Sequence, residues 1–320
     1  MLSRNFQFYL AIGLALCSVA NATIVVDAFS LEGGFPTPHG EYIKEAWGIF
    51  TKHGYDKMEK YNLNQKHSVA IVRLGPGKSS IFHRHPKIEE SYAVLSGEGT
   101  VYLHRDHAGY RPFKTKTQIY SGDLVVIPVK TEHLVVNHGL EDLVLSVVAA
   151  DPWNPTCMED LEKEKYGTEE FARKRAEILD FFHDAAEGSV LNSRNARAEE
   201  PVKGLIVREL WGLNQKQTYF TDTPQHSVTH VTFSPGFKET AHFHLKSEET
   251  FLVLKGVATI HVQNPETGEI ESAEVAEGNL VPIPVGLIHF VENNTSEEMV
   301  ILAATAEPWT LEDVHSAPSR

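Results

Sequence analysis

The sequence contains two sets of side chains of the types that bind transition metals. Each set has three histidines and one glutamate, namely His83, His85, Glu90 and His133 in the first and His242, His244, Glu249 and His289 in the second. Residues two apart on a β-strand point to the same face, so both histidines of each His-x-His pair would project together. Imidazole nitrogens and carboxylate oxygens suit divalent Fe, Mn, Cu, Ni or Zn. We therefore expect two divalent transition metals per chain, one for each set.

An internal repeat supports this interpretation, because an isolated His-x-His is more often a buried structural pair than a metal site. Residues 77–97 align with residues 236–256 without a gap, and both segments begin and end with glycine. Downstream, Gly122, Pro128 and Asn137 also have counterparts of the same type in the second copy. The same ligand types kept in register twice favour metal binding over a chance arrangement.

The elements around these residues are predicted to be β-strands. Runs such as 68–72, 124–127 and 143–148 are short, rich in β-branched residues and bounded by glycine, proline or charge. Many short strands with glycine-containing turns are typical of a sandwich or a closed barrel. Since 320 residues are enough for two domains, each copy of the repeat is expected to form one barrel.

A helical connector is predicted between the two copies. Residues 158–187 are charged, and apolar side chains recur there at helical spacing: Phe171, Ile178, Leu179, Phe182 and Ala185. Gly188 would end this helix, and residues 189–203 have the composition of a loop. We expect the helix to pack on the first barrel.

The spacing within each copy is similar to the two sequence motifs of the cupin superfamily. The first motif is glycine, five residues, His-x-His, three or four residues, glutamate, six residues and glycine, and both copies fit it. The second motif is glycine, five residues, Pro-x-Gly, two residues, histidine, three residues and asparagine, and the second copy fits it throughout. In the first copy Lys130 replaces the turn glycine, which predicts a changed turn conformation there.

The resemblance implies an all-β bicupin, with two tandem cupin barrels of the double-stranded β-helix or jelly-roll type. The predicted boundaries are a signal peptide at residues 1–22, an N-terminal barrel at 23–156, a helical connector and linker at 157–203, and a C-terminal barrel at 204–320. It further implies that each metal lies at the base of a barrel mouth. Coordination positions would then remain open to water, oxygen or substrate.

Side chains next to the ligands would decide the chemistry of each site. By strand alternation, Ile81 and Tyr92 share the pocket face of the first site, and Thr240 and Phe251 share that of the second. The hydroxyl-bearing Tyr92 and Thr240 are the candidate catalytic residues. Plain core packing is the alternative, above all for Ile81 and Phe251.

Bicupins with two complete metal sites resemble oxalate decarboxylases, but one position argues against that substrate. Those enzymes carry an arginine three residues before the first histidine, where it can bind the dicarboxylate, and here Ser80 and Glu239 occupy the position. We expect instead a metal-dependent oxygenase or oxidoreductase, of the dioxygenase kind, acting on a small organic substrate. A redox-neutral isomerase, lyase or decarboxylase is one alternative. A non-enzymatic storage or small-molecule-binding cupin is another, although storage cupins generally lose the metal histidines that are present here.

The composition fits a small-molecule partner better than a polyanionic one. The formal net charge is −14, with 29 basic against 43 acidic residues. Such a chain is repelled by nucleic acid and by anionic membranes, so neither is expected as a partner. A homo-oligomer is compatible with the resemblance, because cupins often associate through their barrel edges.

The first residues are predicted to direct secretion. An apolar run over residues 6–19 precedes a small-x-small sequence, so cleavage is expected after Ala22. Removal of this segment leaves Cys157 as the one remaining cysteine, which excludes a disulfide within the mature chain. Two formal glycosylation sequons begin at Asn293 and Asn294, and Asn293 is expected on a barrel strand.

Overall fold

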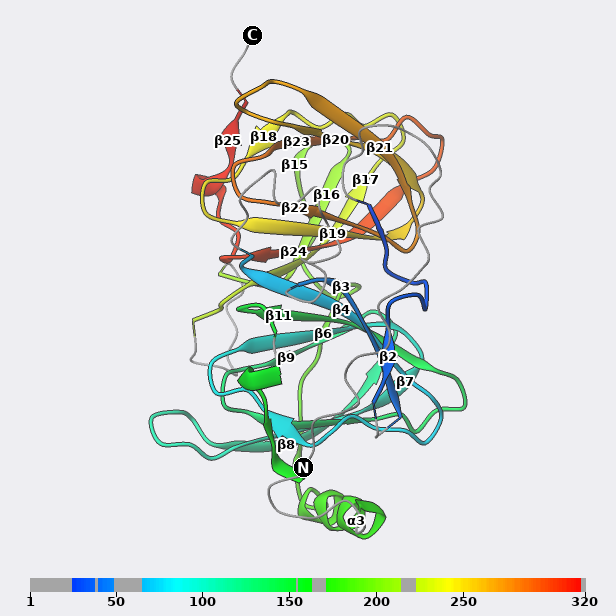
Figure 1. Ribbon diagram of the computed structural model, residues 1–320, viewed down its shortest axis with the longest axis vertical. Coiled ribbons are helices and arrows are strands. Elements are labelled where there is room, and N and C mark those ends of the chain that lie inside the picture. Colours follow the sequence, from blue (N-terminus) through cyan, green and yellow to red (C-terminus); the bar gives the residue numbers. More distant parts are fainter. Residues whose placement is uncertain are drawn as a thin grey trace, which may run out of the picture.

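The computed structural model describes residues 25–37, 40–48, 65–153, 155–162, 171–213 and 223–317. Within these residues the chain forms two β-barrels stacked along the long axis of the molecule (Figure 1). Each barrel is built from two sheets with an apolar core between them. The expected all-β class with two tandem barrels and a small helical connector is confirmed.

The first barrel contains a seven-stranded and a six-stranded sheet among the described residues. The order in the first sheet is β14 (Leu191–Asn192), β9 (Asp123–Ile127), β6 (Glu89–Ser96), β11 (Leu143–Ala150), β4 (His67–Leu74), β3 (Glu41–Trp47) and β2 (Phe35–Pro36). The order in the second sheet is β12 (Glu159–Asp160), β5 (His83–Arg84), β10 (Glu132–Val136), β7 (Glu98–Arg105), β8 (Phe113–Tyr120) and β13 (Ala186–Glu187).

The second barrel repeats this plan. Its larger sheet has the order β1 (Val26–Asp27), β22 (Asn279–Ile283), β19 (Glu248–Lys255), β24 (Met299–Ala306), β17 (Ser227–Phe233), β16 (Leu205–Trp211) and β15 (Glu199–Val202). Its smaller sheet has the order β21 (Ile270–Ala276), β20 (Val257–Gln263), β23 (Ile288–Glu292), β18 (His242–Phe243) and β25 (His315–Ser316). β1 lies within the range predicted for the N-terminal barrel, yet it pairs with β22 of the second barrel. The domain boundaries themselves remain a prediction.

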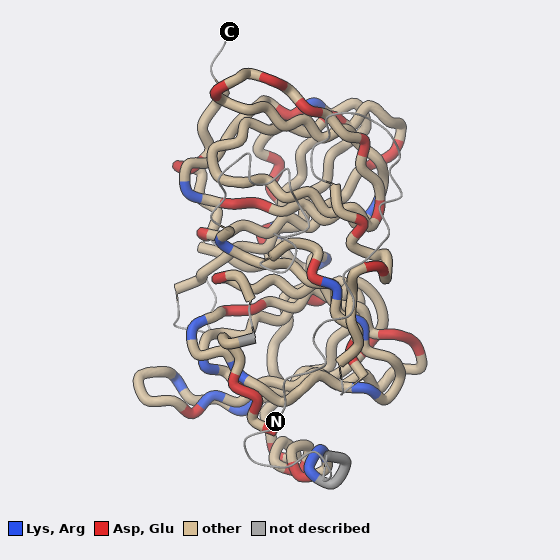
Figure 2. Tube along the Cα trace, viewed as in Figure 1, with Lys and Arg blue, Asp and Glu red and all other residues tan. Residues whose placement is uncertain are grey.

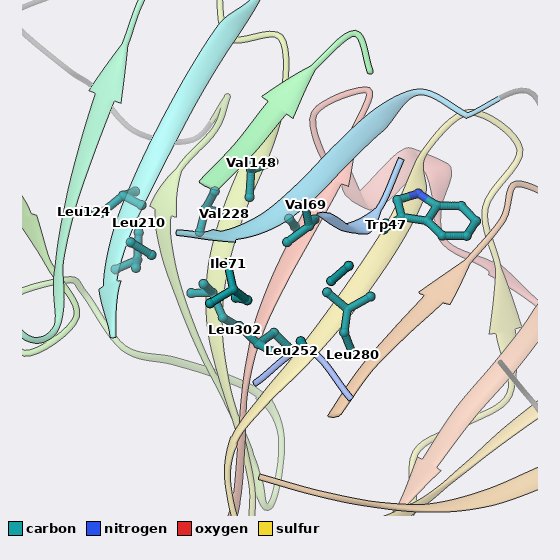
Figure 3. Packing of buried hydrophobic residues seen from close by; sticks show 14 of the residues in the cluster. Trp47, Val69, Ile71, Leu124, Val148, Leu210, Val228, Leu252, Leu280 and Leu302 are labelled. Carbon is teal, nitrogen blue, oxygen red and sulfur yellow. The ribbon is translucent and has the colours of Figure 1, made fainter. Parts of the chain in front are cut away.

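The larger sheets of the two barrels pack against each other and share one apolar core. Successive residues of a strand point to opposite faces. In β6, Tyr92 therefore packs inside the first barrel, whereas Ala93 joins the core between the barrels. Figure 3 shows Ile71 of β4 in that core beside Leu302 of β24. Because each buried aliphatic side chain stabilises by about 1.5–3 kcal/mol, the shared core makes the two barrels one packed unit.

The connector contains the helix α3 (Phe171–Phe181), which lies at the end of the first barrel remote from the second (Figure 1). Ile178 and Phe182 are buried in a cluster with apolar side chains of the first barrel, including Phe82 and Tyr102. The expected packing of the helix on the first barrel is therefore found.

The helix is shorter than the 158–187 range that the apolar spacing predicts. Glu159–Asp160 forms β12 and pairs with β5, and Ala186–Glu187 forms β13 and pairs with β8. Edge strands present unpaired N–H and C=O groups. Residues at both ends of the connector hydrogen-bond to those groups as strands, and they therefore do not join the helix.

The predicted signal peptide at residues 1–22 lies outside the described residues. In the part of the chain that the structure describes, no helix has the length and apolar character to cross a membrane. Figure 2 shows acidic and basic residues interspersed over both barrels.

Candidate metal centres

The first predicted ligand set lies inside the first barrel, where three strands bring its members together. β5 carries His83, β6 carries Glu90 and β10 carries His133, and His83 is the register partner of His133 across the β5–β10 pair. His85 follows directly after β5. Each of the four residues offers a ligand atom, and these atoms all lie within 4.8 Å of one another. All four residues are buried.

The second ligand set repeats the arrangement in the second barrel. His242 on β18 is the register partner of His289 on β23, and Glu249 lies on β19. With His244, these residues form a group with the same 4.8 Å limit. His242 is half-buried and the other three are buried, so the second site is slightly more open than the first.

In all six imidazole rings the same nitrogen, Nδ1, lies 2.9–3.1 Å from a backbone carbonyl oxygen. In four of them the carbonyl belongs to the residue two positions earlier, as in His83 with Ile81. An Nδ1–H that donates to a carbonyl leaves Nε2 as the free lone pair for a metal. The backbone of each barrel therefore selects the ring nitrogen that faces the centre of the site.

The carbonyls that orient the remaining two rings come from segments after the barrel strands. Cys157, at the end of the 3₁₀ helix η2 (Pro155–Cys157), accepts from His85, and Asp313, at the end of η4 (Leu311–Asp313), accepts from His244. The structure gives the Cys157 backbone a definite role beside the first site, although the sequence carries no motif for it.

The donor set fits a divalent transition metal. Within each group the nitrogens and carboxylate oxygens approach one another closely, as for His289 Nε2 and Glu249 Oε2 at 3.0 Å and His85 Nε2 and Glu90 Oε1 at 3.3 Å. The Nε2 atoms of His85, His133, His244 and His289 are buried without a hydrogen-bond partner. Buried polar atoms normally have a partner, and a shared cation would provide one. The chain thus has two His₃–Glu sites for divalent transition metals, one in each barrel.

The electrostatics of the first group also favour a cation. Burial lowers the pKa of His83 well below its usual value, and the neighbouring imidazoles lower it further. Burial would lower the pKa of His85 too, but the Glu90 carboxylate and the hydrogen bond that His85 Nδ1 makes with Cys157 raise that pKa to about 10. Burial would raise the pKa of Glu90, but His85 and His133 hold it well below its usual range. The group therefore stabilises a positive charge at its centre, and a metal would compete with a proton for that position.

The turn that delivers the third histidine has the same conformation in both barrels, so the expected change at Lys130 is wrong. Lys130 has φ +63° and Gly286 has φ +86°. Lys130 N donates to His85 O at 2.7 Å, and Gly286 N donates to His244 O at 2.8 Å. The left-handed backbone costs a non-glycine residue about 1–2 kcal/mol. The hydrogen bond to the ligand segment and the packing of the barrel hold the turn against that cost.

The four predicted pocket residues differ in their surroundings. Tyr92 is buried, its hydroxyl donates to Glu90 Oε2 at 3.2 Å, and its ring lies 6.0 Å from that of His133. Phe251 has the same relation to His289, also at 6.0 Å. Ile81 is half-buried, whereas Thr240 is exposed, and both supply carbonyls that orient histidines. The catalytic roles predicted for Tyr92 and Thr240 remain predictions.

A further carboxyl group lies near each site: Glu41, which no sequence motif marks, at the first, and Glu239, at the position of the oxalate decarboxylase arginine, at the second. Glu41 lies on β3, is 8% exposed and accepts a hydrogen bond from Thr37 Oγ1. Burial raises the pKa of Glu41 to about 7, with a smaller contribution from Glu90. At the second site, burial likewise raises the pKa of Glu239 to about 7, and Glu239 Oε2 accepts from Val291 N at 3.1 Å.

Comparisons with known proteins match each half of the chain to a different family model. Residues 60–163 match the model of the auxin-binding protein family, and residues 217–315 match that of the polysaccharide biosynthesis C-terminal domain. Auxin-binding protein 1 of Arabidopsis thaliana is 35% identical over 82 residues, 26% of this chain and 41% of that protein. Germin-like protein 4-1 of Oryza sativa subsp. japonica is 30% identical over 135 residues, 41% of this chain and 50% of that protein. The matches thus span half or less of the length of these two relatives.

The fold is shared with solved bicupin structures. The structure of Bacillus subtilis oxalate decarboxylase, determined in work on its Mn(II) centres, superposes with a TM-score of 0.64. It is 17% identical, and the superposition covers 93% of this chain and 80% of that one. Identity at this level indicates a common fold and does not extend to the reaction. Together with the two metal-binding motifs, these similarities define a class: the chain is a two-domain member of the cupin superfamily, a metal-binding bicupin.

Proposed function

We propose that the protein is a metal-dependent enzyme whose first site performs redox-neutral acid–base chemistry, such as decarboxylation, on a small organic anion. The observation that carries this proposal is Glu41. It lies on the same face of β3 as Ile43, which packs against the interior core of the first barrel. Its carboxyl group interacts electrostatically with Glu90 and with Tyr92. A proton-carrying group thus lies within electrostatic reach of the metal-binding cluster, on β3 of the sheet that also contains β6.

Glu41 is suited to exchange a proton at neutral pH. A general acid or base works best when its pKa is near the working pH, and burial raises the pKa of Glu41 to about 7. Tyr92 has a different role in this proposal. Its hydroxyl donates to Glu90 Oε2 and fixes the orientation of that carboxylate.

A guanidinium group from the connector lies beside Ser80 of the first barrel. Arg175 of α3 donates to Ser80 O at 3.0 Å and pairs with Glu162 Oε1 at 2.9 Å. Ser80 occupies the position at which oxalate decarboxylases, by the resemblance noted above, carry their arginine. The helical connector therefore brings a guanidinium group to this position from another part of the chain, and guanidinium groups recognise carboxylates.

The chemistry assigned to this site balances without an oxidant. A divalent metal held by the four ligands would polarise an oxygen atom bound to it. In a decarboxylation the bond between the carboxylate carbon and its neighbour breaks, carbon dioxide leaves, and the electron pair stays on the remaining carbon. Protonated Glu41 supplies the proton for the new C–H bond, and water then returns a proton to Glu41.

The second site is proposed to have a structural or auxiliary role. Glu239 stands where the substrate-binding arginine of oxalate decarboxylases would be, and a carboxyl group there disfavours an anionic substrate. Thr240 stays a candidate catalytic residue for this site, on its exposed rim.

An oxygenase is the second candidate function, and the donor set favours it. Three imidazoles and one carboxylate suit redox-active Fe, Mn or Cu, and the half-buried Ile81 leaves part of the first pocket apolar. The dioxygenase or oxidoreductase activity expected from the sequence therefore remains a proposal. A storage role is disfavoured because both sites keep all four ligand types. We also propose, from the N-terminal sequence alone, that the protein is secreted.

Substitution of Glu41 tests the proposal. Metal-loaded protein would be screened for carbon dioxide release from small carboxylic, dicarboxylic and oxo acids. Glu41→Gln should lower kcat by about 10²–10⁴-fold while two equivalents of metal remain bound. Glu239→Gln is the matched control, because it removes the carboxyl group beside the other site, and turnover should stay within about twofold. A Glu41→Gln protein with full activity would remove Glu41 from the mechanism.

Oxygen dependence separates the two candidates. Turnover should continue unchanged under strict anaerobiosis if the reaction is redox-neutral. Oxygen uptake would be followed in parallel with enols, catechols and flavonoid-like compounds. Turnover that stops without oxygen would overturn the acid–base proposal and favour the oxygenase.

A further inference from the structure

Each metal site is connected to the opposite barrel through the residue that precedes its glutamate ligand. Glu89, next to Glu90 on β6, is 2% exposed and its side chain reaches the second barrel. Its Oε1 accepts from Trp211 Nε1 at 2.8 Å and from Gln225 N at 3.0 Å, and lies 2.9 Å from His226 Nδ1. The three partners belong to the second copy of the repeat.

The reciprocal arrangement holds the second site. Glu248, next to Glu249 on β19, is 1% exposed and reaches the first barrel. Its Oε1 accepts from Trp47 Nε1 at 2.7 Å and lies 3.0 Å from His67 Nδ1, and its Oε2 accepts from Lys66 N at 3.1 Å. We call these two groups the crossed clamps: Glu89 with Trp211, Gln225 and His226, and Glu248 with Trp47, Lys66 and His67.

A second contact on each strand reinforces the clamp. The other ring nitrogen of His226 lies 2.8 Å from Ser91 Oγ, and that of His67 lies 3.1 Å from Thr250 Oγ1. Ser91 is two residues after Glu89, so both point to the same face of β6. Each histidine therefore bridges two side chains of the strand that carries the opposite metal-binding glutamate.

The side chains on the two faces of β6 thus contact different barrels. Glu90 and Tyr92 point into the first metal site, while Glu89 and Ser91 point into the second barrel. A buried carboxylate needs its donors, and removing one of them leaves a desolvated charge without compensation, which is unfavourable. The strand can relieve that cost by moving toward another partner, and any such movement displaces Glu90, which is the next residue.

We propose that the crossed clamps position the metal-binding glutamates, so that each barrel sets the metal affinity of the site in the other barrel. Trp211 and His226 are positioning residues for the first site, and Trp47 and His67 are positioning residues for the second. This inference concerns metal binding alone and stands whether the reaction is acid–base or oxidative. It gives a physical reason for two barrels in one chain, because neither site has its full support within its own barrel.

The test uses the full chain with one site removed at a time. His242→Ala with His244→Ala leaves only the first site, and His83→Ala with His85→Ala leaves only the second. Trp211→Phe or Trp47→Phe is then added to each background, since phenylalanine keeps most of the ring and removes the N–H donor. Binding of Mn²⁺ alone is measured by titration, and circular dichroism checks that each protein is folded.

Each tryptophan substitution is expected to weaken metal binding in the opposite barrel and not in its own. Trp211→Phe should weaken Mn²⁺ binding at the first site about tenfold and leave the second site within about twofold. Tenfold is the lower end of the effect of removing a direct partner of a metal ligand, because Trp211 acts on Glu90 through Glu89. Trp47→Phe should weaken Mn²⁺ binding at the second site about tenfold and leave the first site within about twofold. The two tryptophans are matched controls, because both are buried in the interface between the barrels.

Three outcomes would overturn the inference. Equal weakening of both sites by either variant would indicate a general loosening of the interface. Weakening only of the site in the same barrel as the tryptophan would reverse the assignment, and no change at either site would remove it. If a tryptophan variant does not fold, His226→Gln and His67→Gln address the same crossed contacts with the same expected directions.

Discussion

The six imidazole rings of the two sites depend on backbone carbonyls rather than on side chains for their orientation. Four of the carbonyls lie two residues earlier on the chain, as Thr131 does for His133. Substitution of those neighbours would therefore leave the hydrogen bond in place, because the acceptor belongs to the main chain. The ring orientation is a property of the strand geometry, so it recurs in both barrels although most neighbouring side chains differ.

Glu41 should make the stability of the metal-free protein depend on pH. Its pKa rises from 4.5 to about 7 on folding because it is buried. The folded state therefore keeps a proton that the unfolded state releases, and the resulting stabilisation is complete below pH 4.5 and is lost as the pH rises through 7. A shift of this size corresponds to about 3 kcal/mol.

Glu41→Gln removes this effect. In chelator-treated protein, the variant should lose less stability than the parent between about pH 4.5 and pH 7, by up to about 3 kcal/mol. Urea unfolding midpoints at several pH values measure the difference. Parallel curves for the two proteins would show that Glu41 does not titrate in this range.

At the scale of the element, the two turns before the third histidine allow a direct comparison of lysine and glycine in one conformation. A side chain added at Gly286 would meet no atom within 4 Å, so the backbone alone decides its effect. Lys130 already occupies the equivalent left-handed position.

Exchange of these residues should change stability in opposite directions. Gly286→Ala should destabilise the protein by about 1 kcal/mol, and Lys130→Gly should stabilise it by about 0.5–1 kcal/mol, since glycine tolerates positive φ but is more flexible when unfolded. Denaturant unfolding of both variants checks the signs. A destabilised Lys130→Gly protein would mean that the lysine side chain contributes more than its backbone strain costs.

In each barrel an asparagine directly follows the strand that carries the third histidine ligand: Asn137 follows β10 and Asn293 follows β23. Asn293 Nδ2 donates to Phe233 O, Ser234 O and Glu297 O, and Asn137 Nδ2 donates to Leu74 O and Glu141 O. Both residues are fully buried. In each barrel the asparagine therefore ties the third strand to the neighbouring turn.

Burial decides which of the two glycosylation sequons is accessible. The Asn293 amide is occupied inside the barrel, whereas Asn294 is exposed. If the chain is expressed through a eukaryotic secretory route, a glycan is expected on Asn294 and not on Asn293. Asn294→Gln should abolish the mass shift on deglycosylation, and a shift that persists would assign the glycan to another residue.

At the scale of the whole molecule, metal binding should stabilise both barrels together, because they share one apolar core. Ligands that bind the folded state alone stabilise it by about 2.7 kcal/mol at a hundred times their Kd. Metal analysis of protein prepared without chelator should give two equivalents per chain. Chelation should lower the unfolding temperature, and readdition of Mn²⁺ should restore it.

Emptying one site should leave the other able to bind. In the His83→Ala, His85→Ala protein, metal content should fall from two equivalents to one. The crossed clamps connect the sites through their glutamate strands, and they remain intact in this variant because none of their residues is changed. Loss of both equivalents would instead mean that the first metal is needed to fold the pair of barrels.

The sequence by itself determined the two groups of metal-binding side chains and the barrel class. Both follow from local rules. Alternation along a strand makes His83 and His85 share a face, and the internal repeat has the same residue types at the same spacing in both copies. The ends of the helical connector were not predictable in this way, because edge pairing of β12 and β13 depends on strands far away in the sequence.

Only the tertiary structure decided which residues meet across sheets and barrels. Glu41, Arg175 and the crossed clamps carry no motif, and their partners are separated by long stretches of chain, as Trp47 is from Glu248. Local periodicity states which way a side chain points. What it meets there depends on how the sheets pack, and that packing is set by the burial of apolar surface over the whole molecule.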